Sequence, residues 1–141
     1  MIRPATTADI PAIVGMVERL HASIGSPLPM DAHVSARFLT MLIAAPRLGW
    51  VRVWDAGQGP SGFLAASITT ASISMLPIAA EHGWWAEGGG GLRLLRAYLD
   101  WAKEQGCFAA RMSTPPHNDR AAEILERSGF LLAEQAWVKV L

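Results

Sequence analysis

Four consecutive glycines, Gly88–Gly91, separate a strand-like segment from a helix-like one. Leucines recur at helical spacing after the run, and this pattern predicts a helix over about residues 92–105. Glycines at such a junction let backbone N–H groups approach a ligand closely, and the N-terminus of a helix attracts anions. The run therefore indicates a site for a phosphate or pyrophosphate group. An ordinary flexible turn is the other interpretation that the sequence leaves open.

Two common phosphate-binding motifs do not fit this run. A P-loop is excluded because no Gly-Lys-Ser/Thr sequence follows the glycines. The dinucleotide-binding fingerprint fits poorly because the run comes late in the chain, after a segment expected to form a β-meander. A nucleotide-binding module of another kind would need Mg²⁺-binding residues, and none accompanies the glycines.

The periodicity of the apolar residues indicates a single α+β domain over residues 1–141. An antiparallel meander is followed by a strand-helix-strand crossover that should be right-handed and parallel. This order excludes a plain alternating βα sheet and predicts a mixed one. The expected order is β-α-α-β-β-β-α-β-α-β-β, with strands at about residues 1–4, 50–54, 62–70, 72–85, 107–113, 130–132 and 137–141, and helices at about 7–24, 31–45, 92–105 and 118–127.

Composition and charge exclude several function classes. Lys and Arg number 12 and Asp and Glu also number 12, so the net charge is zero, which argues against a nucleic-acid partner. The single cysteine excludes a disulfide framework, and the four histidines have no metal-ligand spacing, so we expect no metal. No stretch is long and apolar enough to span a membrane, and no leader precedes the first expected strand. We therefore expect a cytoplasmic protein without a membrane partner.

Three segments, taken in order, are similar to those of a known family. Residues 2–13 begin Ile-Arg-Pro-Ala-Thr, residues 91–107 follow the glycines, and residues 118–130 run from Asn118 to the pair Gly129-Phe130. They resemble the first strand and helix, the helix after the pyrophosphate loop, and the late Asn…Ala…Gly-Phe helix of the GNAT N-acetyltransferases. The resemblance implies a GNAT-like acyl-CoA N-acyltransferase fold, with a mixed sheet of about six to seven strands flanked by four helices. It also implies direct transfer of acetyl from the co-substrate acetyl-CoA to the primary amine of a small molecule or peptide.

The resemblance assigns roles to residues around the glycines. In the family a carboxylate on the strand before the loop often takes a proton from the substrate amine, and Glu81 is the candidate here, with His82 second. Alternation along a strand should place Glu81 and His82 on opposite faces, and both can also be read as solvated strand residues. Asn118 would bind the pantetheine arm, or it is an ordinary helix N-cap. The residues expected to bind acetyl-CoA are Trp85, Ala86, Gly88, Gly89, Gly90, Gly91, Leu92, Arg93 and Asn118.

The register of the glycine run carries an expectation of its own. If Gly91 takes the last position of the family's loop pattern, Gly89 takes its first glycine position. We therefore expect Gly89→Asp and Gly91→Asp to abolish CoA binding through charge and bulk, and Gly90 to tolerate alanine better. Acceptor specificity is expected to come from about residues 21–35 and from the turn of the meander.

Two positions depart from the family pattern. Ala86 stands where the family usually has Arg or Gln, and the loop before the glycines is short. Leu125 stands where many members have a tyrosine that protonates the leaving thiolate, and the only tyrosine, Tyr98, lies in the preceding helix. The alternative function is therefore a degenerate, non-catalytic GNAT domain that binds an acyl-CoA or acts as a structural or interaction module. A homodimer through apolar strand or tryptophan surface is compatible with either function.

Overall fold

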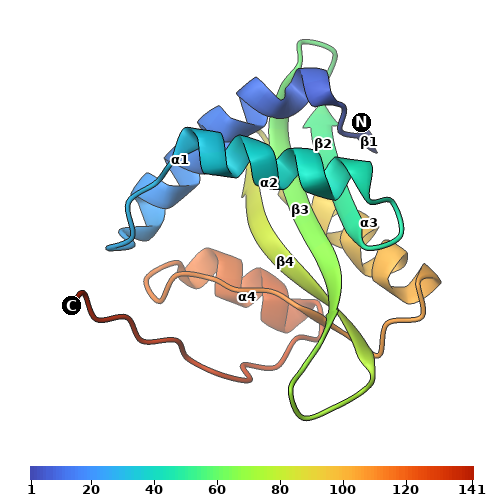
Figure 1. The fold of residues 1–141 in the computed structure, drawn as a ribbon, viewed down its shortest axis with the longest axis vertical. Coiled ribbons are helices and arrows are strands. Elements are labelled where there is room, and N and C mark those ends of the chain that lie inside the picture. Colours follow the sequence, from blue (N-terminus) through green and yellow to red (C-terminus); the bar gives the residue numbers. More distant parts are fainter.

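A five-stranded mixed sheet forms the centre of the protein, as seen in a computed structural model that describes residues 1–141 (Figure 1). The strands follow the order β1-β2-β3-β4-β5. The first four are antiparallel to their neighbours, and β5 runs parallel to β4. The elements in chain order are β1 (Ile2–Pro4), a 3-10 turn (Thr7–Asp9), α1 (Ile10–Ile24), α2 (Ala32–Ala44), β2 (Gly49–Asp55), β3 (Pro60–Thr70), β4 (Pro77–Ala86), α3 (Gly91–Glu104), β5 (Ala109–Arg111) and α4 (Asp119–Arg127). The predicted α+β class and mixed sheet are confirmed.

The sheet has fewer strands than the sequence predicted. Residues 130–132 and 137–141 were expected to be strands, but they are extended chain without secondary structure. A strand exists only when its backbone groups pair, and residues 131–141 make no backbone hydrogen bond. The strand predicted from residue 72 begins instead at Pro77, because residues 71–76 form the connection between β3 and β4. The strand predicted over residues 107–113 pairs only over Ala109–Arg111.

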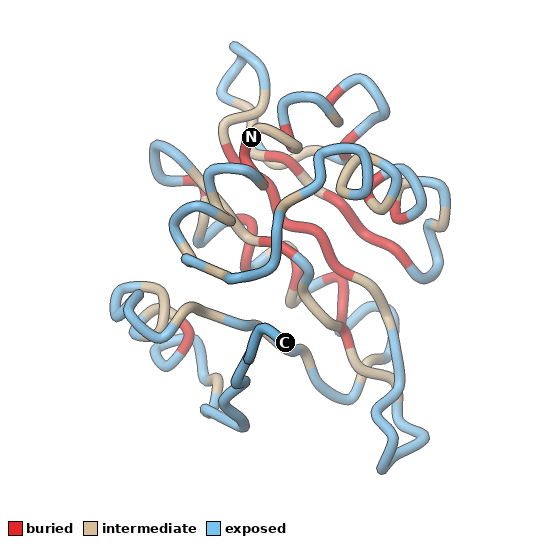
Figure 2. The backbone as a smooth tube through the Cα atoms, turned by 60° about the vertical axis from the view of Figure 1, so that its left-hand side comes forward, coloured by how far each residue is buried: buried red, intermediate tan, exposed pale blue.

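Helices cover both faces of the sheet because the central strands are apolar on both sides. Alternate residues of β3 face opposite ways: Leu64 and Ala66 pack with α3, whereas Phe63 and Ala65 pack with α1 and α2. In Figure 1, α1 and α2 cross one face and α3 lies behind the other. Figure 2 shows that the buried residues follow these central strands. None of the helices is long and apolar enough to span a membrane.

An ionic cluster fixes the N-terminal strand against the rest of the sheet. The Arg3 guanidinium binds the carboxylate of Asp9 at 2.8 Å and that of Asp55 at 2.9 Å. The Asp9 carboxylate also accepts a hydrogen bond from the backbone N–H of Thr6 at 2.8 Å. Together these interactions, the Arg3 hydrogen bond first, lower the pKa of Asp9 to about 2. The cluster therefore joins β1, the start of α1 and the end of β2.

Candidate functional site

The two parallel strands at the edge of the sheet pair over only three residues each. Ile78–Ala80 of β4 pair with Ala109–Arg111 of β5. β4 then continues to Ala86, whereas β5 ends at Arg111. The outer edge of β4 therefore has no strand partner from Glu81 to Ala86, a length of roughly 20 Å at about 3.3 Å per residue. Unpaired backbone groups along such an edge can bind an extended ligand that carries amide groups.

A β-bulge in β4 lies at the start of this free edge. Glu81 pairs with Ala66 of β3 and Gly83 pairs with Ala65, so His82 has no counterpart. Bulges bend a strand and re-aim its side chains, and they are frequent next to active sites. Glu81 shares the face of Ala66, which packs with α3, whereas His82 contacts α2 on the other face. The structure thus places Glu81 and His82 on opposite faces, as alternation along a strand predicts.

The Glu81 carboxylate reaches across the divergence of β4 and β5. Its Oε2 accepts hydrogen bonds from the backbone N–H and from the hydroxyl of Ser113, both at 3.1 Å. Burial raises the pKa of Glu81, and the two donors of Ser113 act in the opposite direction. A carboxylate held in one orientation, with a raised pKa, is suited to accept a proton from a bound amine.

The His82 imidazole lies on the side of the sheet that α1 and α2 cover. Its Nε2 is 2.6 Å from the hydroxyl of Ser67, and its ring meets the ring of Phe38 edge to face at 4.9 Å between centroids. Burial lowers the pKa of His82, so the neutral imidazole predominates near pH 7. A neutral imidazole can take up a proton, which gives this face of β4 a second group able to act as a base.

The glycine run forms the turn between β4 and α3. Gly88 and Gly89 have φ of +72° and +98°, which glycine adopts without strain. None of the backbone N–H groups from Gly88 to Arg93 donates a hydrogen bond within the protein. Some of these groups also form the N-terminus of α3, where the helix dipole is positive. Six unpaired donors in the turn and at the start of α3 provide the chemistry that binds phosphate oxygens.

Gly90 is the sterically constrained glycine of this turn. A Cβ on Gly90 would lie 2.2 Å from Cγ of Trp54, which is too close for any carbon atom. A Cβ on Gly91 would meet its nearest neighbours only at 3.6 Å, and one on Gly89 would meet nothing within 4 Å. The expectation that Gly90 tolerates alanine better than its neighbours is therefore wrong. The constraint on Gly90 comes from its contact with Trp54 of β2, which the local sequence does not show.

The side chains around the turn favour an anionic ligand. Arg93, on the first turn of α3, stacks over the ring of Trp54 at 4.9 Å. Glu87 precedes the glycines, but its carboxylate binds Arg19 of α1 at 2.9 Å and accepts the indole N–H of Trp85 at 3.2 Å. The negative charge next to the turn is thus paired with a cation. Leu92 is exposed beside Arg93.

The last residues of β4 lead directly into the turn. Trp84 packs with α3 and donates its indole N–H to the carbonyl of Gly91 at 3.1 Å. Trp85 packs on the opposite face with α1 and α2. Ala86 pairs with Gly62 and ends the strand. The short connection therefore brings the expected residues Trp85, Ala86 and Gly88 to one end of the free edge.

Asn118 lies at the N-terminus of α4. Its side-chain oxygen accepts the backbone N–H of Ala121 at 3.1 Å, so it caps the helix. Its amide nitrogen makes no hydrogen bond within the protein and can still donate to a ligand. The preceding loop is tied to α1 because His117 Nε2 lies 3.0 Å from the carbonyl oxygen of Ser23.

No tyrosine is available as an acid beside α4. Leu125 is buried in the core cluster under α3. The buried hydroxyl of Tyr98 donates to the carbonyl of Arg111 at 2.9 Å. Burial raises the pKa of Tyr98 well above its usual value, so this tyrosine stays neutral and acts as a structural donor.

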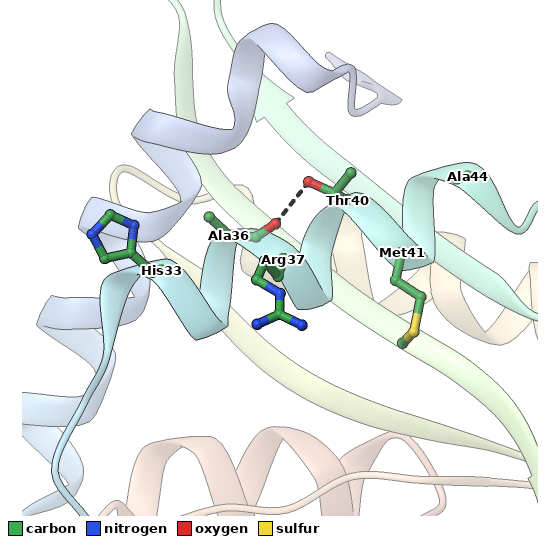
Figure 3. A pocket seen from close by; sticks show the side chains of 6 residues that line it. All are labelled: His33, Ala36, Arg37, Thr40, Met41 and Ala44. Carbon is green, nitrogen blue, oxygen red and sulfur yellow. Dashed lines mark hydrogen bonds between the residues drawn. The ribbon is translucent and has the colours of Figure 1, made fainter.

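Two hollows lie on the exposed face of α2. One, of about 470 Å³, is lined by His33, Ala36, Arg37, Thr40, Met41 and Ala44 (Figure 3). The other, of about 370 Å³, is lined by Val34, Arg37, Phe38 and Met41. Because Phe38 contacts the His82 ring, the second hollow adjoins the bulged side of β4. Neither hollow includes the glycine turn.

Several side chains that shape the site were missed in the sequence. Ser113, Ser67 and Phe38 fix Glu81 and His82, and Trp54 packs against the glycine turn. Ser113 ends a predicted strand, which was the one available signal. The other contacts join elements far apart in the chain, so periodicity could not show them. No group of three or more His, Cys, Asp or Glu side chains is arranged to hold a metal ion.

Solved structures of the same fold cover the whole chain. A predicted acetyltransferase from Clostridium acetobutylicum, whose crystal structure is described with acetyl-CoA, has a TM-score of 0.79 at 15% identity, over 100% of this chain and 95% of that one. A probable acetyltransferase has a TM-score of 0.76 at 18% identity, over 100% and 96% of the two chains. A transcriptional regulator from Bacillus halodurans has a TM-score of 0.79 at 22% identity, over 100% and 99%. No protein-family model matches the chain, and no curated protein matches it.

These comparisons define the class of fold. The mixed α+β sheet flanked by four helices and the neighbours named acetyltransferases agree with the GNAT acetyltransferase fold. At 15–22% identity the likeness concerns the fold. The reaction has to be argued from the residues of the site.

Proposed function

We propose that this protein is an N-acetyltransferase that transfers the acetyl group of acetyl-CoA to a primary amine. One observation carries the proposal: the free edge of β4 leads directly to six unpaired N–H groups, Gly88 to Arg93, at the N-terminus of α3. An acyl-CoA has an amide-containing arm that ends in a pyrophosphate. The free edge of β4 offers partners for the arm, and the N–H groups that follow it offer partners for the pyrophosphate.

The residues of the site fit such a ligand. The glycine turn and the start of α3 would hold the pyrophosphate through backbone donors, without an arginine or glutamine at Ala86. The free edge of β4 and the unpaired amide nitrogen of Asn118 would bind the arm. When bound, acetyl-CoA supplies the acetyl group as a thioester. The protein orients it and manages the proton of the amine.

The transfer needs a base for that proton. The amine nitrogen forms a bond to the acetyl carbon, the carbon–sulfur bond breaks, and the sulfur leaves as a thiolate. A thiolate is stable enough near neutral pH to leave without a dedicated acid, which agrees with Leu125 in the position of the tyrosine. Glu81 is the proposed base because its carboxylate lies at the divergence of the strands and is oriented by Ser113. His82, on the opposite face, is the second candidate.

The base assignment is tested by kinetics on two variants. Glu81→Gln keeps the size of the side chain but removes its basicity, so we expect kcat to fall by roughly 10²–10⁴ with little change in acetyl-CoA affinity. Glu123→Gln, an exposed carboxylate on α4, is the matched control and should keep full activity. An unchanged rate for Glu81→Gln at all pH values would remove Glu81 as the base and leave His82→Gln as the next variant to measure.

The activity itself is tested by release of the CoA thiol with a panel of amines. Small-molecule amines and peptides with a free N-terminus or lysine should be compared, because all of them present a primary amine. We expect thiol release that depends on one of these acceptors. Binding of acetyl-CoA without turnover on any amine would favour the alternative function, a non-catalytic acyl-CoA-binding domain.

A specific observation keeps that alternative in view. The Bacillus halodurans structure with the same fold is named a transcriptional regulator. Ala86 and Leu125 also stand where the family pattern has an Arg or Gln and a Tyr. The two functions differ in one measurable property, because only the enzyme requires a base at Glu81.

A further inference from the structure

The two hollows on α2 form one groove, because Arg37 and Met41 line both of them. Figure 3 shows these two side chains leaving the helix on the same side. Neither hollow is lined by Asp or Glu, and half or more of the residues that line each hollow are apolar. The Thr40 hydroxyl is already used, since it donates to the carbonyl of Ala36 at 2.8 Å. This α2 groove therefore offers the Arg37 guanidinium in a largely apolar setting.

The Arg37 guanidinium has no carboxylate partner. It is exposed and makes no ion pair within the protein. Asp31 is the acidic residue closest to it in sequence, but its Oδ1 accepts the backbone N–H groups of His33 and Val34 at 2.9 and 3.1 Å and caps α2. A guanidinium binds a carboxylate through two parallel N–H···O bonds, which an ammonium group cannot do. Arg37 is therefore available to bind an anionic group of a ligand.

Phe38 connects the α2 groove with the proposed site of acetyl transfer. It lines the second hollow, and its ring meets the His82 ring edge to face at 4.9 Å between centroids. His82 is the bulged residue of β4, and the free edge of that strand begins at the bulge. A ligand that lies in the groove and extends past Phe38 therefore reaches this edge. Glu81 and His82 flank the edge from its two faces.

The size of the groove fits a small acceptor. Its two hollows have volumes of about 470 and 370 Å³. Pockets of about 300–1,000 Å³ hold small molecules. Val34 and Met41 can cover an apolar side chain of such a ligand, because both are exposed on the groove. The groove thus combines an anion-binding group, an apolar wall and access to the edge of β4.

We propose that the acetyl acceptor is a small amine that also carries a carboxylate, in chemical class an apolar amino acid. Its carboxylate would bind Arg37, its side chain would lie against Val34 and Met41, and its amine would extend past Phe38. This assignment rests on the proposed acetyl transfer. The amine nitrogen bonds to the acetyl carbon, the amine proton passes to the base of the site, and CoA leaves as the thiolate. The products are an N-acetylated amino acid and free CoA.

The same groove disfavours cationic acceptors. A polyamine or a lysine-rich peptide would bring further positive charge toward Arg37, and like charges repel. No carboxylate lines the groove to offset that repulsion. Specificity of this kind arises from the unfavourable contact as well as from the favourable one. Amino acids and polyamines are therefore the acceptors to compare.

Kinetics on matched acceptors test the assignment. Leucine and phenylalanine are compared with their own amides, which keep the amine and the side chain but lose the negative charge, and with spermidine. We expect a lower KM for each acid than for its amide, and an Arg37→Gln variant that reduces this preference about tenfold. Arg47→Gln is the matched control, since Arg47 is exposed just after α2 and lines neither hollow, and it should keep the preference. Because each pair is compared across variants, the different basicity of acid and amide cancels.

Binding of the product gives a test that needs no turnover. N-acetyl-leucine and its amide are titrated into isotope-labelled protein, and chemical shifts are followed by NMR. We expect the acid to bind at Phe38 and Met41, and to bind about tenfold more weakly to Arg37→Gln but not to Arg47→Gln.

The two experiments separate this assignment from the proposed acetyl transfer. Thiol release with no preference for the acids, with a preference that persists in Arg37→Gln, or with spermidine as the best acceptor would overturn the assignment and leave acetyl transfer standing. Binding of N-acetyl-leucine that depends on Arg37, without thiol release from any acceptor, would support the carboxylate site and contradict acetyl transfer. Neither binding nor thiol release would overturn both.

Discussion

Replacing Gly90 by alanine would place a methyl carbon 2.2 Å from Cγ and 2.6 Å from Cδ1 of Trp54. The backbone of Gly90 has φ of −78° and ψ of −11°, which alanine adopts freely, so the cost is steric and not conformational. Overpacking of this kind costs about 1–3 kcal/mol. For a domain of this size we expect the melting temperature to fall by about 4 °C for each kcal/mol, or by about 4–12 °C in total.

The neighbouring glycine supplies the matched control for this measurement. A Cβ on Gly91 lies 3.6 Å from its nearest neighbours, and Gly91 is the first residue of α3. Gly91→Ala should therefore be neutral or stabilising by up to about 1 kcal/mol, because it reduces the entropy of the unfolded chain. Thermal denaturation followed by circular dichroism measures both variants.

A double-mutant cycle tests the cause of the effect. Trp54→Ala removes the atoms that the new methyl group meets, so Gly90→Ala should cost much less in that background than in the wild type. The same cost in both backgrounds would refute the steric reasoning. Equal melting temperatures for Gly90→Ala and Gly91→Ala would refute it as well.

Three further predictions concern stability and its pH dependence. Arg3 holds the pKa of Asp9 at about 2, against 3.8 for the free group, so Asp9→Asn should lower the free energy of unfolding at pH 7 by about 1–2 kcal/mol after solvent screening of Arg3. In chemical denaturation this difference should vanish as the pH falls from about 4 toward 2. A difference that stays constant with pH would contradict the prediction. Tyr98→Phe removes the donor to the part-buried carbonyl of Arg111 and should cost about 0.5–1.5 kcal/mol in urea unfolding. The pH profile of the rate should not change, and a shifted profile would give Tyr98 a role in the reaction. The lowered pKa of His82 means that protonation opposes folding, so stability should fall as the pH drops below about 6.5, and His82→Gln should flatten that part of the stability curve measured by thermal unfolding.

The sequence predicted the elements that have strong local signals. The helix after the glycines has its apolar residues on one stripe, and Trp50–Trp54 alternates, so the α+β class and the mixed sheet follow from the sequence pattern. The two predicted strands at the end of the chain have the right composition but no neighbouring strand. A local sequence pattern shows that a segment prefers an extended backbone. Whether that segment forms a β-strand depends on a neighbouring strand that is far away in the chain or in another molecule.

The sequence predicted some parts of the candidate site and missed others. The glycine turn comes from the order of strand, turn and helix. Glu81 and His82 were named by the resemblance to the GNAT family, and alternation along a strand gave their opposite faces. The bulge at His82 could not be read from the sequence, because it arises from the register of β4 against β3. The contact of Gly90 with Trp54 joins residues from opposite ends of the meander, and it reversed the order of tolerance that the loop pattern suggested.

Binding of acetyl-CoA is the central claim, and a thermal-shift titration with acetyl-CoA tests it most directly. A ligand at 100 times its Kd stabilises by about 2.7 kcal/mol, which corresponds to roughly 10 °C for a domain of this size. We expect a saturable shift with acetyl-CoA and not with ATP. Gly89→Asp puts a carboxylate among the unpaired N–H groups and should abolish the shift. Gly106→Asp, at a glycine of similarly positive φ at the far end of α3, should retain it. No shift at millimolar acetyl-CoA, or an equal shift in both variants, would contradict a cofactor site at the glycine turn.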